Sequence, residues 1–313
     1  MKAFITGAGG FMGPHLVDYL KKKGFEVVST YFEPISDINE LKQKGEAFEL
    51  DVRDKEKLKQ ALADFKPDHV YHLAAQSYPA VSWDKPNLTV QSNVEGTVNL
   101  FECFKELNIN PLTLVACSSA EYGFVTADEV PVKETHSLKP LHPYGVSKVG
   151  QDLLTYQYFK NFGLKGIRAR IFNTTGPGKV NDVCSDFTKR AVMIEKGMEQ
   201  TFRVGNLEVK RAITDVRDTV RGFYLMLEKC QPGEVYNISG STAYKIGDIL
   251  NKIVEITEIN PKIEIDPKLL RPTDEPIIIG DSSKLQLLTD WKQEIPLDQT
   301  LRDMINYWRK KLR

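Results

Sequence analysis

The chain has few cysteines and no excess of either charge. Its four cysteines lie far apart, with no Cys-x-x-Cys pair and no cysteine–histidine spacing typical of a metal site. This pattern argues against a disulfide framework, indicates a reducing compartment and predicts no metal. Forty-two basic residues balance forty-two acidic ones. The chain therefore offers no general attraction for nucleic acid or an anionic membrane, and any anionic ligand must be bound locally.

Long hydrophobic runs are also missing. No segment is apolar enough over the length needed to span a bilayer, and Met1 leads directly into a predicted strand rather than into a charged and then apolar leader. We therefore expect a cytoplasmic protein that does not attach to membranes. No repeat or low-complexity tract interrupts the 313 residues, which suffice for one large α/β domain or two smaller ones.

A glycine-rich segment follows the first predicted strand. Gly7, Gly10 and Gly13 have GxxGxxG spacing between apolar residues 3–5 and a helical pattern that includes Leu16. In this context the first glycine permits a tight turn, the second lets the backbone approach a pyrophosphate, and the third lets the helix pack on its strand. The helix N-terminus would then face the anion. The segment predicts a dinucleotide site, because an ordinary turn would not need three glycines in this register.

Strand and helix patterns alternate through residue 172. Apolar strand-like segments occur at residues 26–30, 48–52, 68–75, 112–117 and 167–172, with helical patterns such as 55–65, 90–107 and 144–162 between them. This alternation predicts an α/β fold with a Rossmann-like, doubly wound parallel sheet. We assign residues 1–174 to an NAD(P)-binding domain, to which residues 212–240 could return. Residues 175–313, which are richer in proline loops, are assigned mainly to a smaller mixed lobe that binds substrate.

The residues after the second predicted strand bear on the choice of cofactor. An acid there binds the ribose hydroxyls of NAD, whereas an arginine binds the 2′-phosphate of NADP. Glu33 therefore favours NAD(H) over NADP(H), with a solvated loop carboxylate as the alternative. Asp51, near the end of the third strand, is a candidate acceptor for the adenine amino group. The residues expected to contact the cofactor are Gly7, Gly10, Phe11, Met12, Gly13, Glu33, Asp51, Val52, Leu73, Ala74, Ala75, Tyr144 and Lys148.

Tyr144 and Lys148 lie four residues apart on one face of a predicted helix. A phenol has a reference pKa of about 10, and an ammonium group one turn away favours the phenolate and lowers that pKa. Such a pair can exchange a proton with a carbinol or ketone oxygen. Ser119, which follows the strand over 112–117, is expected to contact the same oxygen. A surface Tyr–Lys pair is the alternative, but the dinucleotide loop and the serine favour a catalytic site.

Together these motifs resemble the extended short-chain dehydrogenase/reductases that act on nucleotide sugars. The resemblance covers nearly the whole chain and includes HLAAQS at residues 72–77 and NVEGT at 93–97. VGNLEVKR at 204–211, DVRD at 215–218 and LRPT at 270–273 resemble the branch acting on GDP-linked sugars. That branch contains the GDP-mannose 4,6-dehydratases and the GDP-4-keto-6-deoxy-mannose reductases.

The resemblance also implies a substrate site and an assembly. It assigns the diphosphate of a GDP-linked sugar to Arg211 and Arg271, whose guanidinium groups can donate in pairs; surface salt bridges are the alternative. It further implies a homodimer with a four-helix interface built from residues 90–107 and 144–162, with a place in the core for apolar residues such as Leu153, Leu154 and Tyr158 as the alternative. The residues expected at the substrate are Gln76, Ser77, Asn173, Lys189, Arg211 and Arg271.

Two reactions of that branch fit the motifs. A dehydratase oxidises C4, uses a carboxylate to remove the C5 proton while water leaves C6, and then returns the hydride. A reductase only delivers hydride to an existing C4 ketone. Glu121 is the candidate carboxylate, although the reductases also keep it, and SSAEYG at residues 118–123 is closer to their SSEEYG. We favour the reductase, with the dehydratase, a nucleotide-sugar 4-epimerase and a catalytically silent NAD(P)-binding protein as alternatives.

Overall fold

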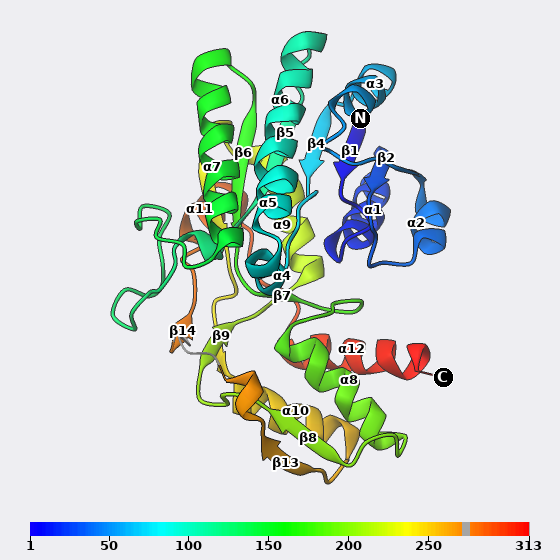
Figure 1. Ribbon diagram of the computed structural model, residues 1–313, viewed down its shortest axis with the longest axis vertical. Coiled ribbons are helices and arrows are strands. Elements are labelled where there is room, and N and C mark those ends of the chain that lie inside the picture. The colour runs from blue at the N-terminus through cyan, green and yellow to red at the C-terminus, as the bar shows by residue number, and fades with distance from the viewer. Residues whose placement is uncertain (271–275, 313) are drawn as a thin grey trace.

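The computed structural model describes residues 1–270 and 276–312 and shows an α/β architecture (Figure 1). Among these residues a seven-stranded sheet forms the centre, and all its strands are parallel. The strand order reverses between β1 and β4, and open α/β sheets bind ligands at the carboxyl ends of the strands at such a point. The predicted Rossmann-like, doubly wound sheet is confirmed. In order across the sheet, the strands are β11 (Val235–Ile238), β6 (Gly166–Ile171), β5 (Leu112–Ser118), β4 (His69–His72), β1 (Lys2–Thr6), β2 (Glu26–Tyr31) and β3 (Glu46–Glu49).

Alternate side chains of the strands enter two apolar cores, one on each face of the sheet. On β1, Ala3 and Ile5 face one core and Phe4 faces the other, as the two-residue period of a strand requires. Helices cover both faces, so the central strands are buried on both sides, including the polar residues that β4 and β6 carry. No helix in the described part of the chain is long and apolar enough to cross a membrane. The first core includes α1 (Met12–Lys22), α9 (Val216–Lys229) and α11 (Ser283–Thr289), and the second α3 (Lys55–Phe65), α6 (Gly96–Leu107) and α7 (Pro143–Phe162).

Most predicted elements lie close to the observed ones, with two informative differences. The third strand ends at Glu49 rather than at residue 52, because its partner β2 ends at Tyr31, which pairs with Glu49. The helix predicted over 90–107 begins earlier and changes its winding on the way. It comprises α5 (Pro86–Val90), the π-helical turn η1 (Gln91–Glu95) and α6, and is preceded by α4 (Pro79–Asp84). Such π turns often occur near functional sites.

A smaller lobe lies beyond the carboxyl edge of the sheet, at the bottom of Figure 1. Its own apolar core is formed by α8 (Val183–Glu195), α10 (Ile246–Thr257), α12 (Leu297–Lys311) and β8 (Thr201–Val204), and β13 (Lys262–Ile265) pairs with β8. The chain passes between the two lobes several times, since β11, α9 and α11 belong with the large sheet. The remaining elements are α2 (Ile38–Lys44), η2 (Ser119–Glu121), β7 (Thr174–Thr175), β9 (Lys210–Ala212), β10 (Thr214–Asp215), β12 (Ala243–Lys245), η3 (Pro267–Leu269) and β14 (Ile277–Ile278).

Candidate active site

The glycine-rich turn lies at the carboxyl end of β1. Gly7 has a φ of +70°, and a Cβ atom there would lie 2.5 Å from the Cα of Ala74, so the turn approaches the loop after β4 without room for a side chain. α1 starts directly beyond the turn, and its N-cap residue, Phe11, makes no side-chain cap. The first-turn amides of α1 therefore lack a side-chain partner, and such amides bind anions. The turn fits the pyrophosphate of a dinucleotide.

The residues expected near an adenosine lie at the ends of β2 and β3. Glu33 is exposed and has a φ of +43°. Asp51 accepts hydrogen bonds from the Nε (2.8 Å, Oδ2) and the backbone N–H (2.9 Å, Oδ1) of Arg53, so its carboxylate is already engaged. The Arg53 guanidinium lies 5.6 Å from the ring centroid of Phe32. Val52 is buried, and Leu73, Ala74 and Ala75 are half-buried directly beyond β4.

The start of α7 presents Tyr144. His142 is the N-cap residue and accepts the Gly145 N–H at 3.0 Å, and Pro143 occupies the first turn, where its missing N–H has no cost. A Cβ atom on Gly145 would lie 2.7 Å from the carbonyl oxygen of Ala120. The glycine thus lets α7 approach η2 closely, which brings the half-buried Tyr144 to the carboxyl end of β5.

Ser118 is the serine that hydrogen-bonds the Tyr144 side chain. The sequence placed Ser119 there, but β5 continues through Ser118, and Ser119 begins η2. Burial raises the pKa of Tyr144 to about 12, while the hydrogen bond from Ser118 acts in the opposite direction. The phenol is therefore neutral and protonated at physiological pH.

Lys148 lies one turn after Tyr144 but does not make the phenol more acidic. Its Nζ donates to the carbonyl oxygen of Ala116 at 2.8 Å and to Oε1 of Gln151 at 2.7 Å, and lies 5.7 Å from the Tyr144 ring centroid. The sequence spacing predicted a lowered pKa for the phenol, whereas burial dominates in the structure and raises it. Burial also lowers the pKa of Lys148 to about 8.

A chain of buried polar groups connects Lys148 to β1. Gln151 donates to the Thr97 hydroxyl at 2.8 Å, Thr97 donates to the carbonyl oxygen of Asn93 at 2.7 Å, and Nε2 of His72 lies 3.2 Å from the Thr97 hydroxyl. Nδ1 of His72 lies 2.8 Å from the hydroxyl of Thr6, the residue before the glycine turn. Burial, and then the positive charge of Lys148, lower the pKa of His72 to about 3, so this imidazole is neutral.

Glu121 points into a buried ion network rather than standing free at the site. Its side chain is fully buried, its Oε1 accepts the Ser118 N–H at 2.8 Å, and its Oε2 lies 3.2 Å from Nε of Arg170. Arg170 also donates to Asp152 at 2.9 Å, and Arg168 donates to the other oxygen of Asp152 at 2.7 Å. Burial, and then the negative charge of Asp152, raise the pKa of Glu121. We call Glu121, Asp152, Arg168 and Arg170 the buried ion network.

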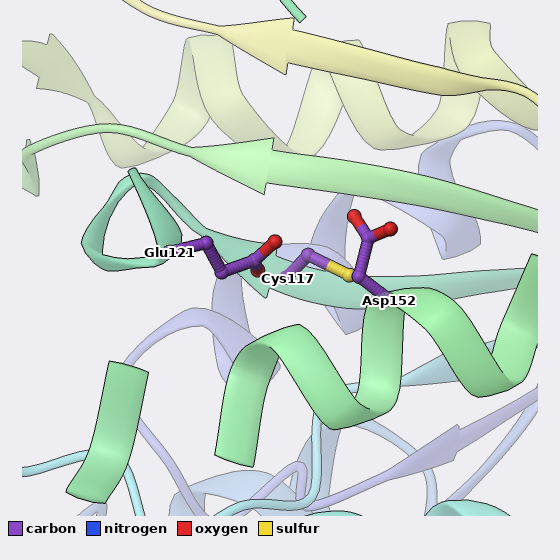
Figure 2. Close-up of side chains that lie close together, drawn as sticks. All are labelled: Cys117, Glu121 and Asp152. Carbon is purple, nitrogen blue, oxygen red and sulfur yellow. The ribbon is translucent and has the colours of Figure 1, made fainter. Parts of the chain in front are cut away.

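Cys117 lies beside the two carboxylates of this network (Figure 2). The three side chains come from β5, η2 and α7, and their donor atoms lie within 4.8 Å of one another. Their surroundings suit an arginine rather than a metal ion, because Arg170 neutralises both carboxylates. Burial also raises the pKa of the Cys117 thiol well above its usual value, which disfavours the thiolate that a metal requires.

The residues expected at the substrate lie in different surroundings. The side chain of Gln76 is used within its own loop, accepting the Tyr78 N–H at 2.6 Å and donating to Thr89 at 3.0 Å. Ser77 and Asn173 are exposed, beyond β4 and β6 respectively. Lys189 is exposed on α8, with its Nζ 5.5 Å from the Trp308 ring centroid. Arg211 lies on β9, and Arg271 lies outside the described residues.

Several residues of this site did not stand out in the sequence. The face that α7 buries is polar and includes Lys148, Gln151, Asp152 and Thr155, whereas apolar Leu153 is exposed. This inversion of the usual helix pattern is visible in the sequence and marks a helix whose inner face needs polar partners. The partners themselves, Arg168, Arg170, Thr97 and Asn93, become recognisable only once the sheet is assembled.

Comparisons with known proteins place the chain among nucleotide-sugar enzymes. Residues 4–304 match the family described as GDP-mannose 4,6 dehydratase. The chain is 28% identical to a GDP-6-deoxy-D-mannose reductase of Pseudomonas aeruginosa, over 100% of this chain and 98% of that protein. It is 26% identical to a GDP-mannose 4,6-dehydratase of Vibrio cholerae, over 97% of this chain and 92% of that protein. The solved structure of RMD from Pseudomonas aeruginosa complexed with NADPH has a TM-score of 0.87 and 27% identity, with 99% of both chains covered.

The burial of Lys148 predicts a site that lowers stability at neutral pH. Its pKa of about 8 lies below its unfolded value of about 10.4, a difference worth about 3 kcal/mol. Below pH 8 Lys148 is protonated in both the folded and the unfolded chain, and the folded chain carries the full cost of the buried charge. From pH 8 to about 10 only the unfolded chain holds the proton, and this cost falls. Two hydrogen bonds offset part of it, at about 1 kcal/mol each. Lys148→Met should therefore raise the free energy of unfolding at neutral pH by about 1–2 kcal/mol, with a gain that disappears towards pH 10.

Urea unfolding across this pH range measures the effect. Lys165→Met is the matched control, because Lys165 is exposed and should show no such gain. A Lys148→Met protein less stable than the wild type at neutral pH would contradict the cost assigned to burying the Lys148 ammonium.

Proposed function

Because the chain belongs to the GDP-mannose 4,6 dehydratase family, we propose that it reduces the C4 ketone of a GDP-4-keto-6-deoxy-hexose with a reduced nicotinamide cofactor. The observation that carries this proposal is the placement of Glu121. A dehydratase needs a carboxylate to remove the C5 proton, but Glu121 is fully buried, accepts the Ser118 N–H and is paired with Arg170. A reductase needs no such base.

The protonation state of Tyr144 also supports a reductase. Reduction of a ketone requires a proton donor, whereas the first, oxidising step of a dehydratase requires a base. Tyr144 is a neutral phenol at physiological pH, as the ordinary pKa of about 10 already requires, and burial raises this pKa to about 12. It can therefore donate a proton without first having to acquire one.

The proposed mechanism assigns a role to each side chain. The turn at Gly7, Gly10 and Gly13 would hold the pyrophosphate of the cofactor, which when bound would supply a hydride to C4 of the sugar. Tyr144 gives its hydroxyl proton to the ketone oxygen, so that the C4 carbonyl becomes an alcohol. When the ketone is bound, the Ser118 hydroxyl turns from the phenol and donates its one hydrogen to the same oxygen as negative charge develops there. Lys148, held by Ala116 and Gln151, would bind the ribose of the nicotinamide, and a proton from solvent restores the phenolate that Tyr144 becomes.

The substrate class rests on the relatives. The named reductase and dehydratase both act on GDP-linked sugars, and we propose the same for this chain. Arg211 on β9 is the proposed partner of the diphosphate, with Arg271 as a second partner assigned by its sequence motif. Asn173, Lys189 and Ser77 stay proposals for the rest of the ligand. Gln76 is better suited to shaping the loop after β4, since its amide is already paired.

Hydride reduction predicts a clear hierarchy among three variants. Tyr144→Phe removes the proton donor and should lower kcat by about 10²–10⁴-fold. Ser118→Ala should lower kcat by about 10²-fold, the usual effect of losing one donor to a developing oxyanion. Ser119→Ala, its neighbour and matched control, should stay within about threefold of wild type, because Ser118 and not Ser119 contacts Tyr144.

Loss of nicotinamide absorbance with a GDP-4-keto-6-deoxy-hexose measures these rates. Equal loss in Ser118→Ala and Ser119→Ala would contradict the assignment of Ser118. Release of water from GDP-mannose with no net cofactor consumption would establish the dehydratase instead. Interconversion of two sugar nucleotides without net redox change would establish an epimerase, and a lack of turnover on all these substrates would indicate a silent NAD(P)-binding protein.

We further propose that Glu33 favours NAD(H), although the Pseudomonas aeruginosa relative was solved with NADPH. An exposed carboxylate just beyond β2 can bind ribose hydroxyls and repels a 2′-phosphate. Glu33→Ala should therefore raise the ratio of kcat/KM for NADPH to kcat/KM for NADH by about tenfold, or about 1.4 kcal/mol. Glu26→Gln, which removes a charge from the exposed opposite end of β2, is the control. An unchanged ratio in Glu33→Ala would remove Glu33 from the cofactor site.

The outer face of α7 supports the proposed homodimer. Val146, Leu153 and Tyr156 are exposed there, at 54%, 52% and 41%, and Trp83 and Val90 are exposed on the neighbouring α4 and α5. Exposed apolar side chains grouped in this way mark interaction surfaces. We expect the wild type to sediment with twice the 35.5 kDa mass of the chain. Leu153→Glu should yield monomers, whereas Leu287→Glu, at an 85% exposed leucine on α11, should not. A monomeric wild type would contradict the dimer.

A further inference from the structure

The turn after β5 fixes Ser118 from two sides. The Ser118 oxygen accepts the Ala120 N–H at 3.2 Å, and the Ser118 N–H donates to Oε1 of Glu121 at 2.8 Å, which together form a capping box around η2. A hydroxyl that accepts one hydrogen bond can still donate its own hydrogen. Tyr144 is the neighbour that this hydroxyl bonds.

Arg170 connects that turn to the helix that carries Tyr144 and Lys148. Its Nε lies 3.2 Å from Glu121 and 2.9 Å from Asp152, and Asp152 is one helical turn after Lys148 on α7. The guanidinium also donates to the Tyr122 hydroxyl at 3.1 Å and to the Glu134 carbonyl oxygen at 3.0 Å. Arg170 is therefore held in one orientation and can tie the end of β5 to α7.

Other roles for Glu121 fit these contacts less well. A general base needs access to the substrate, but none of the Glu121 side chain is exposed. A metal ion bound by Glu121 would need the position beside the two carboxylates, but the Arg170 guanidinium occupies it. A carboxylate that only balances the charge of Arg170 would not need to accept the Ser118 N–H as well.

We propose that Glu121 is a positioning residue: held by Arg170, it fixes the backbone of Ser118 so that the serine hydroxyl stays against the phenol of Tyr144. The inference rests on the proposed function in that Ser118 and Tyr144 act together on the ketone oxygen. It gives the glutamate that the sequence suggested as a base a different role, one that acts only through Ser118.

A double-mutant cycle separates positioning from a purely structural role, because only a residue that acts through Ser118 loses its effect when the serine hydroxyl is absent. We expect Glu121→Leu to lower kcat by about 30–100-fold while KM for the ketone changes less than about threefold, since the ground-state contacts remain. Ser118→Ala should lower kcat by about 10²-fold. The double variant should then be no more than about threefold slower than Ser118→Ala alone.

Two further variants test whether the loss of activity comes from the contact between Glu121 and Ser118. Glu121→Gln keeps an oxygen that can accept the Ser118 N–H, so it should retain more activity than Glu121→Leu, and it replaces the leucine variant in the cycle if that variant does not fold. Arg168→Lys is the matched control: Arg168 belongs to the buried ion network but contacts Asp152 and Gly233. It should lower Tm and leave kcat within about twofold of wild type. Losses that multiply in the double variant, or a folded Glu121→Leu protein with wild-type kcat, would overturn the proposal.

The outcome stays distinguishable from a failure of the proposed function. If the wild type only dehydrates GDP-mannose, the reductase proposal fails, and the double-mutant cycle is measured with the kcat of dehydration. If Glu121 acts as the base of that reaction, the losses of kcat in the two single variants should multiply in the double variant, and Glu121→Gln should be inactive. If Glu121 positions Ser118, the double variant should again be little slower than Ser118→Ala alone. If no substrate is turned over, ¹³C-labelled tyrosine gives a readout without activity. The Tyr144 resonance, assigned by its loss in Tyr144→Phe, should shift in both Ser118→Ala and Glu121→Leu, and a resonance that shifts in Ser118→Ala but not in Glu121→Leu would overturn the proposal.

Discussion

Two arginines and two carboxylates share a buried space between β5, β6 and α7. Each charge alone would cost several kcal/mol to bury, and the set is stable because Arg168 and Arg170 meet Asp152 and Glu121 at hydrogen-bond or ion-pair distance. Removing one member leaves an unpaired buried charge, which typically costs about 3–5 kcal/mol. Within this network Arg170 meets both carboxylates and ties the end of β5 to α7, and so constrains the placement of Tyr144 and Lys148 relative to Ser118.

The same constraint explains the chemistry of the site. The inner face of α7 is polar, so Lys148 enters the interior with acceptors already in place at Ala116 and Gln151. Burial lowers the pKa of this ammonium and raises that of the phenol, which stays protonated. A protonated phenol beside a serine hydroxyl suits proton donation to a ketone. The family membership and the Pseudomonas reductase are consistent with this chemistry.

The sequence predicted the scaffold better than the details of the site. Alternating apolar segments and the glycine turn at Gly7 were enough for the parallel sheet, because both are local signals. Local signals could not decide between Ser118 and Ser119, because a strand end that moves by one residue sends the next side chain to the other face. The placement of Glu121 depends on Arg170, which comes from a later strand. The raised pKa of Tyr144 reflects burial, which spacing alone does not reveal.

Isotope transfer tests the central claim most directly, namely that Tyr144 and its neighbours serve a hydride reduction at C4. The wild type is given a GDP-4-keto-6-deoxy-hexose and nicotinamide cofactor carrying deuterium at its reactive carbon, on either face in separate reactions, and the product is analysed by mass spectrometry and NMR. The account predicts one deuterium at C4 of the sugar from one of the two labelled forms, and no product with Tyr144→Phe on the same time scale. A wild-type product formed without deuterium from either form, or formed equally fast by Tyr144→Phe, would contradict it.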